Sequence, residues 1–453
     1  MIDIKNLKNM VSELSQKLTM VLYTRNLEFS VVRLIFLKYC VDNYIGASRI
    51  EDMQLCAKAQ KMFAIKDIEN GIHTIAAVLD YIDYSYGLNR ILSGNANLDE
   101  YARELFGENS NRTRKNTDAS NFKSVMDILS SMDLEEEKGS NEIGKELVDI
   151  LVDNIVRGSY RNVYSGEITT RLSLCRLVER ILDVKSDDVF CDFASGIGLS
   201  TLVITEQSSP EIINVDINNS TVAVAAMLYI MKGIRNFKIH CDDSLSSPIP
   251  DIRGDKIFVD APFAMPLKKT DINEYTDSSS AVIGRVISNY LSNKKEALAV
   301  MTLPSSALFQ SKKQFVELRR MLIERGFVKA VVALPPMKQG TSVGTNLLII
   351  SREHNDRIVF INAVDSSFSN KARTADISGE TLLSDEKIDM IVDAINNERV
   401  IEGFSNVVTP FEIYDNELNM IPIRYVVPVE KEETITVAEI DTQLEKLYRQ
   451  LMD

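Results

Sequence analysis

From Leu182 to about residue 353, short runs of apolar and β-branched residues alternate with longer stretches of helical length and mixed polarity. Nearly continuous apolar strands joined by helical crossovers are typical of a mostly parallel sheet that helices cover on both faces. The sequence therefore predicts a doubly wound α/β fold for the middle of the chain. The expected strands are residues 187–194, 211–217, 237–243, 255–261, 297–304, 328–335 and 346–353.

The chain before this region has the pattern of helices. Apolar side chains recur at three- and four-residue spacings over residues 7–23 and 29–44. Residues 107–141 are polar and of mixed charge around one short expected helix, so we expect a flexible boundary near residues 133–141. The predicted parts are an N-terminal helical domain at 1–140, an α/β domain at 141–370 and a C-terminal helical extension at 371–453.

The counts of cysteine, histidine and charge exclude several classes of protein. Five scattered cysteines without CxxC spacing and three dispersed histidines indicate no metal site and no Ser-His-Asp triad. The net charge is −14, whereas a protein that binds nucleic acid alone usually has a basic surface. A partner would therefore supply much of any DNA binding. The longest apolar stretch, residues 222–231, is too short to cross a bilayer, so we expect a cytoplasmic protein with no membrane partner.

The first expected strand leads into a turn that contains two glycines. Gly196 and Gly198 allow a tight turn and a close approach of the backbone to a ligand at the next helix N-terminus. A dinucleotide fingerprint would have a third glycine at position 201, where this chain has Thr201, so NAD is disfavoured. The alternative is a strand-to-helix turn without a ligand. Candidate cofactor-binding residues in this segment are Asp192, Ala194, Gly196 and Gly198.

Acidic residues end the next two expected strands. Asp216 lies where a carboxylate can accept hydrogen bonds from both hydroxyls of a ribose, or can cap the helix that begins near Asn219. Asp243 can accept a hydrogen bond from an adenine amino group, or can simply be solvated. Because the carboxyl ends of parallel strands meet at one edge of a sheet, these features together favour an adenosine-containing cofactor.

The fourth expected strand ends in Asp260-Ala261-Pro262-Phe263, which resembles the (Asn/Asp/Ser)-Pro-Pro-(Tyr/Phe) motif of amino-methyltransferases. The lone pair of an exocyclic amine is delocalised into the base. Methyl transfer therefore needs two oxygen acceptors for its hydrogens and an aromatic ring that stacks on the flipped-out base. Asp260 would supply the side-chain acceptor, Ala261 the carbonyl acceptor and Phe263 the ring. The alternative is a buried strand end followed by an ordinary proline-containing loop.

Over nearly its whole length the chain resembles the modification (methyltransferase) subunits of type I restriction-modification systems, of the N-6 adenine DNA methylase family. Residues 30–44 look like the first helical signature of that family. Residues 166–171 occupy the place of its Gly-x-Phe-x-Thr-Pro segment, which adds Thr170 to the candidate cofactor-binding residues. Further similar segments are 225–245, 332–336, 344–347, 417–419, 424–426 and the terminal heptad helix.

This resemblance implies a class I, Rossmann-like methyltransferase domain that uses S-adenosyl-L-methionine as its cofactor. It implies methylation of adenine N6 in duplex DNA, with a DNA-specificity subunit as partner and a restriction subunit as a further candidate partner. The terminal helix at residues 436–452 has an apolar stripe, and we expect it to pack on the partner.

The chain departs from the family pattern in three places. The family has Thr-Pro where this chain has Thr170-Arg171, a different first loop where this chain has residues 193–199, and Asn-Pro-Pro-Phe where this chain has Asp260-Ala261-Pro262-Phe263. Ala261 replaces a proline, which removes a fixed φ angle and some preorganisation of the carbonyl. Three functions therefore stay open. The working hypothesis is a DNA adenine-N6 methyltransferase subunit. The alternatives are a catalytically impaired scaffold or regulatory subunit of a restriction or defence complex, and methylation of another amine or amide, such as a protein glutamine.

Overall fold

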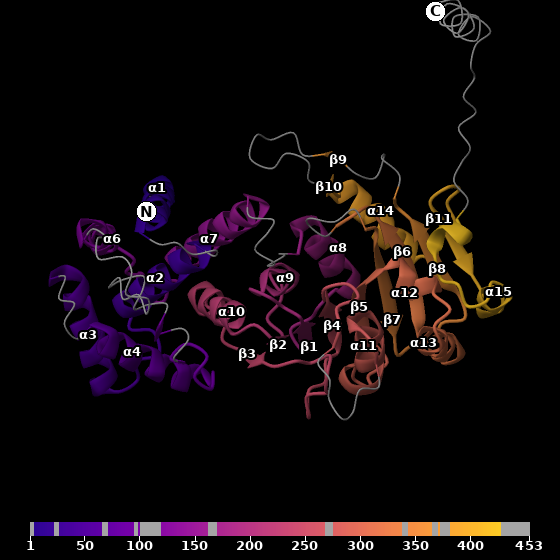
Figure 1. The fold of residues 1–453 in the computed structure, drawn as a ribbon, viewed down its shortest axis with the longest axis horizontal. Coiled ribbons are helices and arrows are strands. Elements are labelled where there is room, and N and C mark those ends of the chain that lie inside the picture. Colours follow the sequence, from indigo (N-terminus) through magenta and orange to yellow (C-terminus); the bar gives the residue numbers. More distant parts are fainter. Residues whose placement is uncertain are drawn as a thin grey trace, which may run out of the picture.

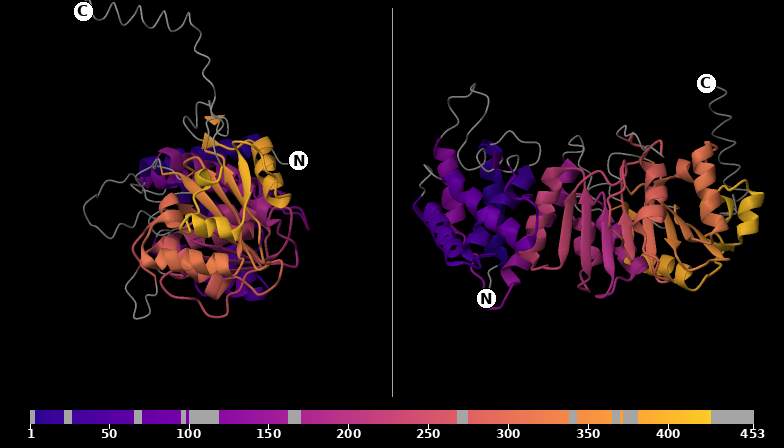
Figure 2. Two further views of the ribbon diagram at one scale, coloured as in Figure 1. Left: turned by 90° about the vertical axis from the view of Figure 1, so that its right-hand side faces the viewer. Right: turned by 90° about the horizontal axis from the view of Figure 1, so that it is seen from below.

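The computed structural model of the protein describes residues 4–21, 27–65, 71–94, 98–99, 119–161, 170–267, 275–337, 343–364, 370–371 and 381–426. Within these ranges, a nine-stranded sheet runs away from a group of N-terminal helices (Figures 1 and 2). Its strands are β1 (Val189–Phe193), β2 (Glu211–Asp216), β3 (Phe237–Cys241), β4 (Lys256–Val259), β5 (Leu298–Pro304), β6 (Val328–Leu334), β7 (Thr345–Ser351), β8 (Ile358–Asn362) and β11 (Ser405–Val408).

The strand order is β11-β8-β6-β7-β5-β4-β1-β2-β3. Strands β1 to β5 pair in parallel with one another, as do β6 and β8, whereas β7 and β11 are antiparallel to their neighbours. The predicted doubly wound, mostly parallel sheet is therefore confirmed. A separate two-stranded ladder joins β9 (Asn370–Lys371) and β10 (Thr381–Leu382).

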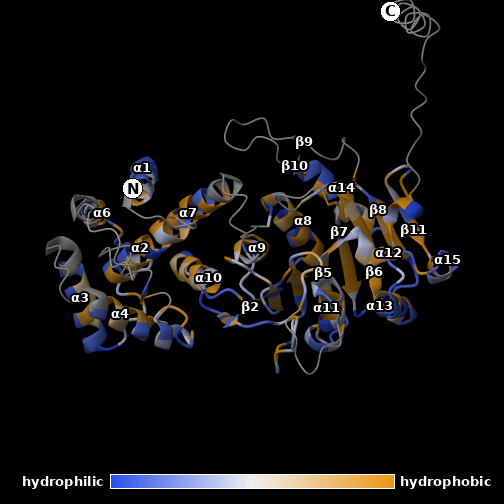
Figure 3. Ribbon diagram, in the orientation of Figure 1, coloured by the Kyte–Doolittle hydropathy of each residue, from blue (hydrophilic) through white to orange (hydrophobic). Residues whose placement is uncertain are grey.

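Helices cover both faces of the sheet because its strands are apolar on both sides. Phe190 of β1 belongs to the cluster under α8 and α14, and the next residue, Cys191, belongs to the cluster under α11 and α13. The central strands are mostly hydrophobic, whereas the helices carry both kinds of residue (Figure 3). These helices are α8 (Leu172–Leu182), α9 (Leu199–Ile204), α10 (Asn219–Lys232), α11 (Ser278–Arg285) with the π-helical η1 (Val286–Tyr290), α12 (Ser305–Phe309), α13 (Lys313–Glu324), α14 (Asp385–Asn396), α15 (Pro410–Asp415) and η3 (Pro422–Arg424).

The N-terminal helices share one hydrophobic core with the end of the sheet. Residues 29–41 and 221–231 are buried throughout, which agrees with their apolar character on every side of the helix. One buried cluster joins these two segments with β2, β3 and the other N-terminal helices. The N-terminal helices are α1 (Ile4–Val21), α2 (Leu27–Asp42), α3 (Ile50–Ile65), α4 (Gly71–Tyr86), α6 (Ala119–Ser131) and α7 (Glu142–Arg161).

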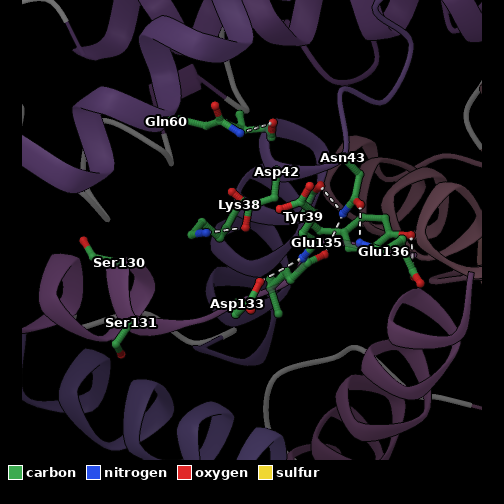
Figure 4. Close-up of polar contacts among 12 residues, drawn as sticks. Lys38, Tyr39, Asp42, Asn43, Gln60, Ser130, Ser131, Asp133, Glu135 and Glu136 are labelled. Atoms are coloured by element: carbon green, nitrogen blue, oxygen red, sulfur yellow. Dashed lines mark hydrogen bonds and ion pairs between the residues drawn. The ribbon is translucent and has the colours of Figure 1, made fainter. Parts of the chain in front are cut away.

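Hydrogen bonds tie residues 133–141 to the end of α2 and to α10. The backbone N–H of Glu136 donates to Asn43 Oδ1 at 2.7 Å, just after α2 (Figure 4). The side chain of Asn141 donates to the Met231 carbonyl oxygen in α10 at 2.9 Å. Residues 133–141, where we expect a flexible boundary, therefore join α6 to α7 as an ordered segment that is hydrogen-bonded to α10 and to the end of α2.

The sheet also continues past residue 370, where the sequence predicts that a separate extension begins. β11 pairs with β8, and Val408 and Met420 lie in the core under α11 and α13. The expected terminal helix at residues 436–452 lies outside the described residues. Among the described helices, none is long and apolar enough to cross a membrane. Within the same residues, no group of three His, Cys, Asp or Glu side chains could hold a metal ion.

Candidate active site

The carboxyl ends of β1 to β5 meet at one edge of the sheet, because these strands pair in parallel. From β1 the chain turns to β2 and β3 on one side, and it later returns to β4 and β5 on the other side. Open α/β sheets bind ligands at such a switch point. The candidate residues at the ends of the first four strands therefore lie at the same edge, as the sequence predicts.

The turn after β1 folds over the end of β2. Ala194, Gly196 and Gly198 have positive φ angles of 60°, 55° and 74°. The backbone N–H of Ser195 donates to the Val215 carbonyl oxygen at 3.2 Å. Gly198 is the N-cap residue of α9 and has no side-chain cap. The amides of Ser195, Gly196 and Gly198 all donate within the protein. A ligand at this edge would therefore use the first backbone N–H groups of α9, which no side chain caps.

Gly198 and Gly196 make a matched pair for substitution by alanine. A Cβ atom at Gly198 would lie 2.0 Å from the buried Tyr229 hydroxyl, whereas one at Gly196 would meet nothing within 4 Å. We expect Gly196→Ala to lower the free energy of unfolding by about 1 kcal/mol, because only the positive φ angle is penalised. Gly198→Ala should lower it by about 3 kcal/mol, because the clash adds to the same penalty. Urea unfolding measures both, and equal losses would contradict this geometry.

The carboxylate of Asp216 is hydrogen-bonded to the turn that follows β1. Its Oδ2 accepts a hydrogen bond from the Gly196 backbone N–H at 2.8 Å, and its Oδ1 accepts one from the Asn218 backbone N–H at 2.8 Å. The cap of α10 is Asn218, whose side chain accepts from the Ser220 backbone N–H. Asp216 is therefore not the helix cap. Its Oδ1 also accepts from the Thr221 hydroxyl at 3.2 Å, so the acceptor capacity that remains for a ribose is mainly on Oδ2.

Asp243 closes the loop that follows β3. Its carboxylate accepts from the Ser246 backbone N–H at 3.0 Å and from the Ser246 hydroxyl at 2.7 Å. The side chain of Asp242 is exposed, and its backbone N–H donates to the Asp216 carbonyl oxygen at 3.0 Å. The end of β3 therefore lies beside the end of β2. The side chain of Asp243 is hydrogen-bonded to Ser246 in the loop that follows β3.

Asp192 lies beneath the turn after β1 rather than on its surface. Its Oδ2 accepts from the Ser200 hydroxyl at 2.5 Å and from the Thr201 hydroxyl at 2.9 Å, both in α9. Burial raises the pKa of Asp192 to about 7, although the two hydroxyls oppose this shift. The nearby carboxylates of Asp260 and Asp216 raise the pKa further. Thr201, at the position of the missing third glycine, thus connects α9 to β1.

Two threonine hydroxyls hold the carboxylate of Asp260. Thr170, just before α8, donates to Oδ2 at 2.7 Å, and Thr302 of β5 donates to Oδ1 at 2.5 Å. Thr302 is buried, with 1 % of its surface exposed. Thr170, a candidate cofactor-binding residue, is thus hydrogen-bonded to Asp260, the candidate acceptor for the amine.

Serine side chains at the start of α11 hold the loop that contains the rest of the motif. Ala261 is buried, Phe263 is half-buried and Pro262 is exposed. The Ser278 hydroxyl donates to the Pro262 carbonyl oxygen at 2.6 Å and accepts from the Met265 backbone N–H at 2.9 Å. The loop is therefore fixed from the side of α11.

Sequence reasoning missed both Thr302 and Ser278 as parts of the site. For Ser278 a signal exists, because Asp277 and Ser280 form a capping box that marks the start of α11. Thr302 lies in the middle of an apolar strand, and no spacing in the sequence links it to Asp260.

This strand order, with a glycine turn after the first strand and acidic residues at the ends of the next two, is the α/β fold of the methyltransferase class that the sequence predicts. Within that class, the chain belongs to the N-6 DNA methylase family, whose model matches residues 160–434. The match includes every strand of the sheet and all candidate site residues.

Similar proteins include the MjaVIII methylase subunit of a type I restriction enzyme from Methanocaldococcus jannaschii, which is 27 % identical over 64 % of this chain and 54 % of that protein. The chain spans about half the length of the curated relatives it matches. The crystal structure of a type I restriction-modification methyltransferase subunit from Streptococcus thermophilus has a TM-score of 0.68 and 18 % identity, covering 93 % of this chain and 99 % of that one. A modification subunit of a putative type I restriction enzyme from Vibrio vulnificus has a TM-score of 0.62 and 15 % identity, covering 97 % and 99 %.

Proposed function

We propose that this chain is the methyltransferase subunit of a type I restriction-modification system, and that it methylates adenine N6 in duplex DNA. The observation that carries the proposal is the position of Asp260. Its carboxylate ends β4 at the switch point of the sheet and is fixed by two hydroxyls beside the glycine turn. An oriented oxygen acceptor at this place suits an exocyclic amine.

The residues at the strand ends fit an adenosine-containing cofactor. Gly196 borders open space, since a Cβ atom there would meet nothing within 4 Å. Asp216, half-buried beside it, would accept the ribose hydroxyls, and Asp243 would accept from the adenine amino group. S-adenosyl-L-methionine, when bound, supplies an electrophilic methyl group. The residues proposed to contact it are Ala194, Gly196, Gly198, Asp216 and Asp243. Of the other two predicted cofactor residues, Asp192 supports the turn from beneath, and Thr170 contacts Asp260.

In the proposed reaction, the chain prepares the amine of a flipped-out adenine. The Asp260 carboxylate and the Ala261 carbonyl oxygen would each accept a hydrogen bond from one N–H of the amine, which directs the nitrogen lone pair toward the methyl group. As the N–C bond forms, the C–S bond that carried the methyl group would break, and the surplus proton of the nitrogen would leave through the Asp260 carboxylate to solvent. The half-buried ring of Phe263 would stack on the base and hold its plane. Pro262 would fix the loop between them, with its carbonyl bonded to Ser278.

The proposed partners are a DNA-specificity subunit and, as a further candidate, a restriction subunit. The net charge of −14 argues that the chain alone binds duplex DNA poorly at physiological salt, because it repels the phosphate backbone. A partner that reads the bases would then bring the DNA to the acceptor site.

Transfer of a tritiated methyl group from S-adenosylmethionine to unmethylated duplex DNA tests the proposal. We expect N6-methyladenine to form when the chain is mixed with the product of a neighbouring specificity-type gene, and little to form without it. Calorimetry on the same preparation measures cofactor binding. Cofactor binding without transfer in the complex would favour the scaffold alternative, and methylation of protein but not DNA would favour an amide substrate.

A further inference from the structure

The hydroxyls of Thr302 and Thr170 reach Asp260 from two parts of the chain that are remote in sequence. Thr302 belongs to β5, whose residue Met301 is paired with Val259 of β4, so Thr302 and Asp260 follow this pair in register. Thr170 approaches from the segment that leads into α8. Each hydroxyl donates to a different oxygen of the same carboxylate.

Two donors on different oxygens fix the rotation of the carboxylate plane about the bond that carries it. Hydrogen bonds from a hydroxyl to a carboxylate are short and strong, and the distances of 2.5 and 2.7 Å fall in that class. Thr302 is itself held rigidly, because it is buried within a strand that is paired on both sides. Loss of either donor would therefore weaken the fixation of the carboxylate plane.

This fixation matters more in a motif that has lost a proline. Ala261 has no ring that restricts φ, so the backbone contributes less to the orientation of the acceptors. The two hydroxyls orient the side-chain acceptor directly, independently of that ring. A displacement of about 1 Å at a reacting group can cost about 100-fold in rate, so this orientation has a measurable consequence.

We propose that Thr302 and Thr170 are positioning residues that set the orientation of Asp260 for methyl transfer. The inference rests on the proposed function. It gives Thr170 a role toward the acceptor, whereas the family resemblance gives it a role toward the cofactor. These roles predict different kinetics, since loss of orientation lowers kcat and loss of cofactor contacts raises the KM for S-adenosylmethionine.

The test compares Thr302→Val, Thr302→Ser and Thr170→Val in the complex with the specificity subunit, on unmethylated duplex DNA. We expect Thr302→Val, which keeps the shape and removes the donor, to lower kcat by about 10- to 100-fold with little change in KM for S-adenosylmethionine. Thr302→Ser should retain most of the rate because it keeps the hydroxyl. Thr170→Val should lower kcat in the same way without weakening cofactor binding in calorimetry.

The matched control is Thr205→Val, another buried threonine, whose hydroxyl bonds the Thr201 carbonyl oxygen within α9. It should keep the wild-type kcat, and thermal unfolding should confirm that all variants fold. A wild-type rate in Thr302→Val, or equal losses in Thr302→Ser and Thr302→Val, would overturn the inference while leaving the proposed function intact. A wild-type complex that transfers no methyl group would overturn the proposed function, and this inference with it.

Discussion

The Asp260→Ala variant should lose methyl transfer by at least about 1000-fold while its affinity for S-adenosylmethionine stays nearly unchanged. Alanine removes the only side-chain acceptor that the motif offers to the amine. The carboxylate is bonded to Thr170 and Thr302 rather than to the glycine turn, so its loss leaves the bonds around Asp216 in place. Single-turnover transfer of a tritiated methyl group measures the loss, and calorimetry measures the affinity.

Ala261→Pro is the matched control at the neighbouring position. It keeps the carbonyl and restores a fixed φ angle, so transfer should be preserved or raised. Wild-type transfer that survives in Asp260→Ala would show that the acceptor lies elsewhere. If the wild type transfers no methyl group but the double variant Asp260→Asn with Ala261→Pro does, the motif has lost its catalytic function and the chain is a scaffold.

The second prediction concerns stability and Asp192. Its folded-state pKa of about 7 lies above the value near 4 of an unfolded aspartate, so between these values the folded state binds the proton more tightly. Its contribution to stability is therefore fully present at low pH and is lost as the pH rises to 7. From pH 5 to pH 7 the loss is about 2 kcal/mol, because the slope is close to 1.4 kcal/mol per pH unit near pH 5 and falls to half of that at pH 7.

Asp192→Asn should remove this loss. Both hydroxyl donors bind the same oxygen, Oδ2, so an asparagine can accept both through its amide oxygen. The variant should gain about 2 kcal/mol in free energy of unfolding relative to the wild type between pH 5 and pH 7, measured by urea unfolding at each pH. Asp242→Asn, which makes the same exchange at an exposed carboxylate, is the matched control. Parallel profiles for wild type and Asp192→Asn would contradict a raised pKa.

The sheet could be predicted from β1 to β7, because each of these strands is an apolar run bounded by polar or turn residues. β8 and β11 were not among the predicted strands. β11 has only four residues, two of them half-buried, and pairs along one side only, so its sequence carries little of the pattern of a strand. The helical pattern of the N-terminal part was equally visible, but its common core with β2 and β3 was not, because periodicity shows that a face is buried and not what covers it.

The site could be predicted where it depends on topology and not where it depends on side-chain contacts. Placing Asp216, Asp243 and Asp260 at one edge needed only the parallel direction of the strands. The contact between Thr302 and Asp260 depends on the register of two strands that lie 42 residues apart in the chain. The burial of Asp192 depends on how α9 crosses β1, which no local pattern encodes.

The buried stretch of α10, residues 221–231, has a consequence for how proteins of this architecture can be recombined. If two relatives exchanged the part of the chain before α8, the N-terminal side chains that pack against residues 221–231 would change. The sequence of α10 itself would stay the same. Protein interiors are close-packed, so side chains that no longer match the surface of α10 would leave voids or clashes. Hybrid genes joined there should yield insoluble or unstable products unless α10 is exchanged together with the helices that surround it. The N-terminal helices and α10 should therefore be exchanged together, although α8, β1, α9 and β2 lie between them in the chain.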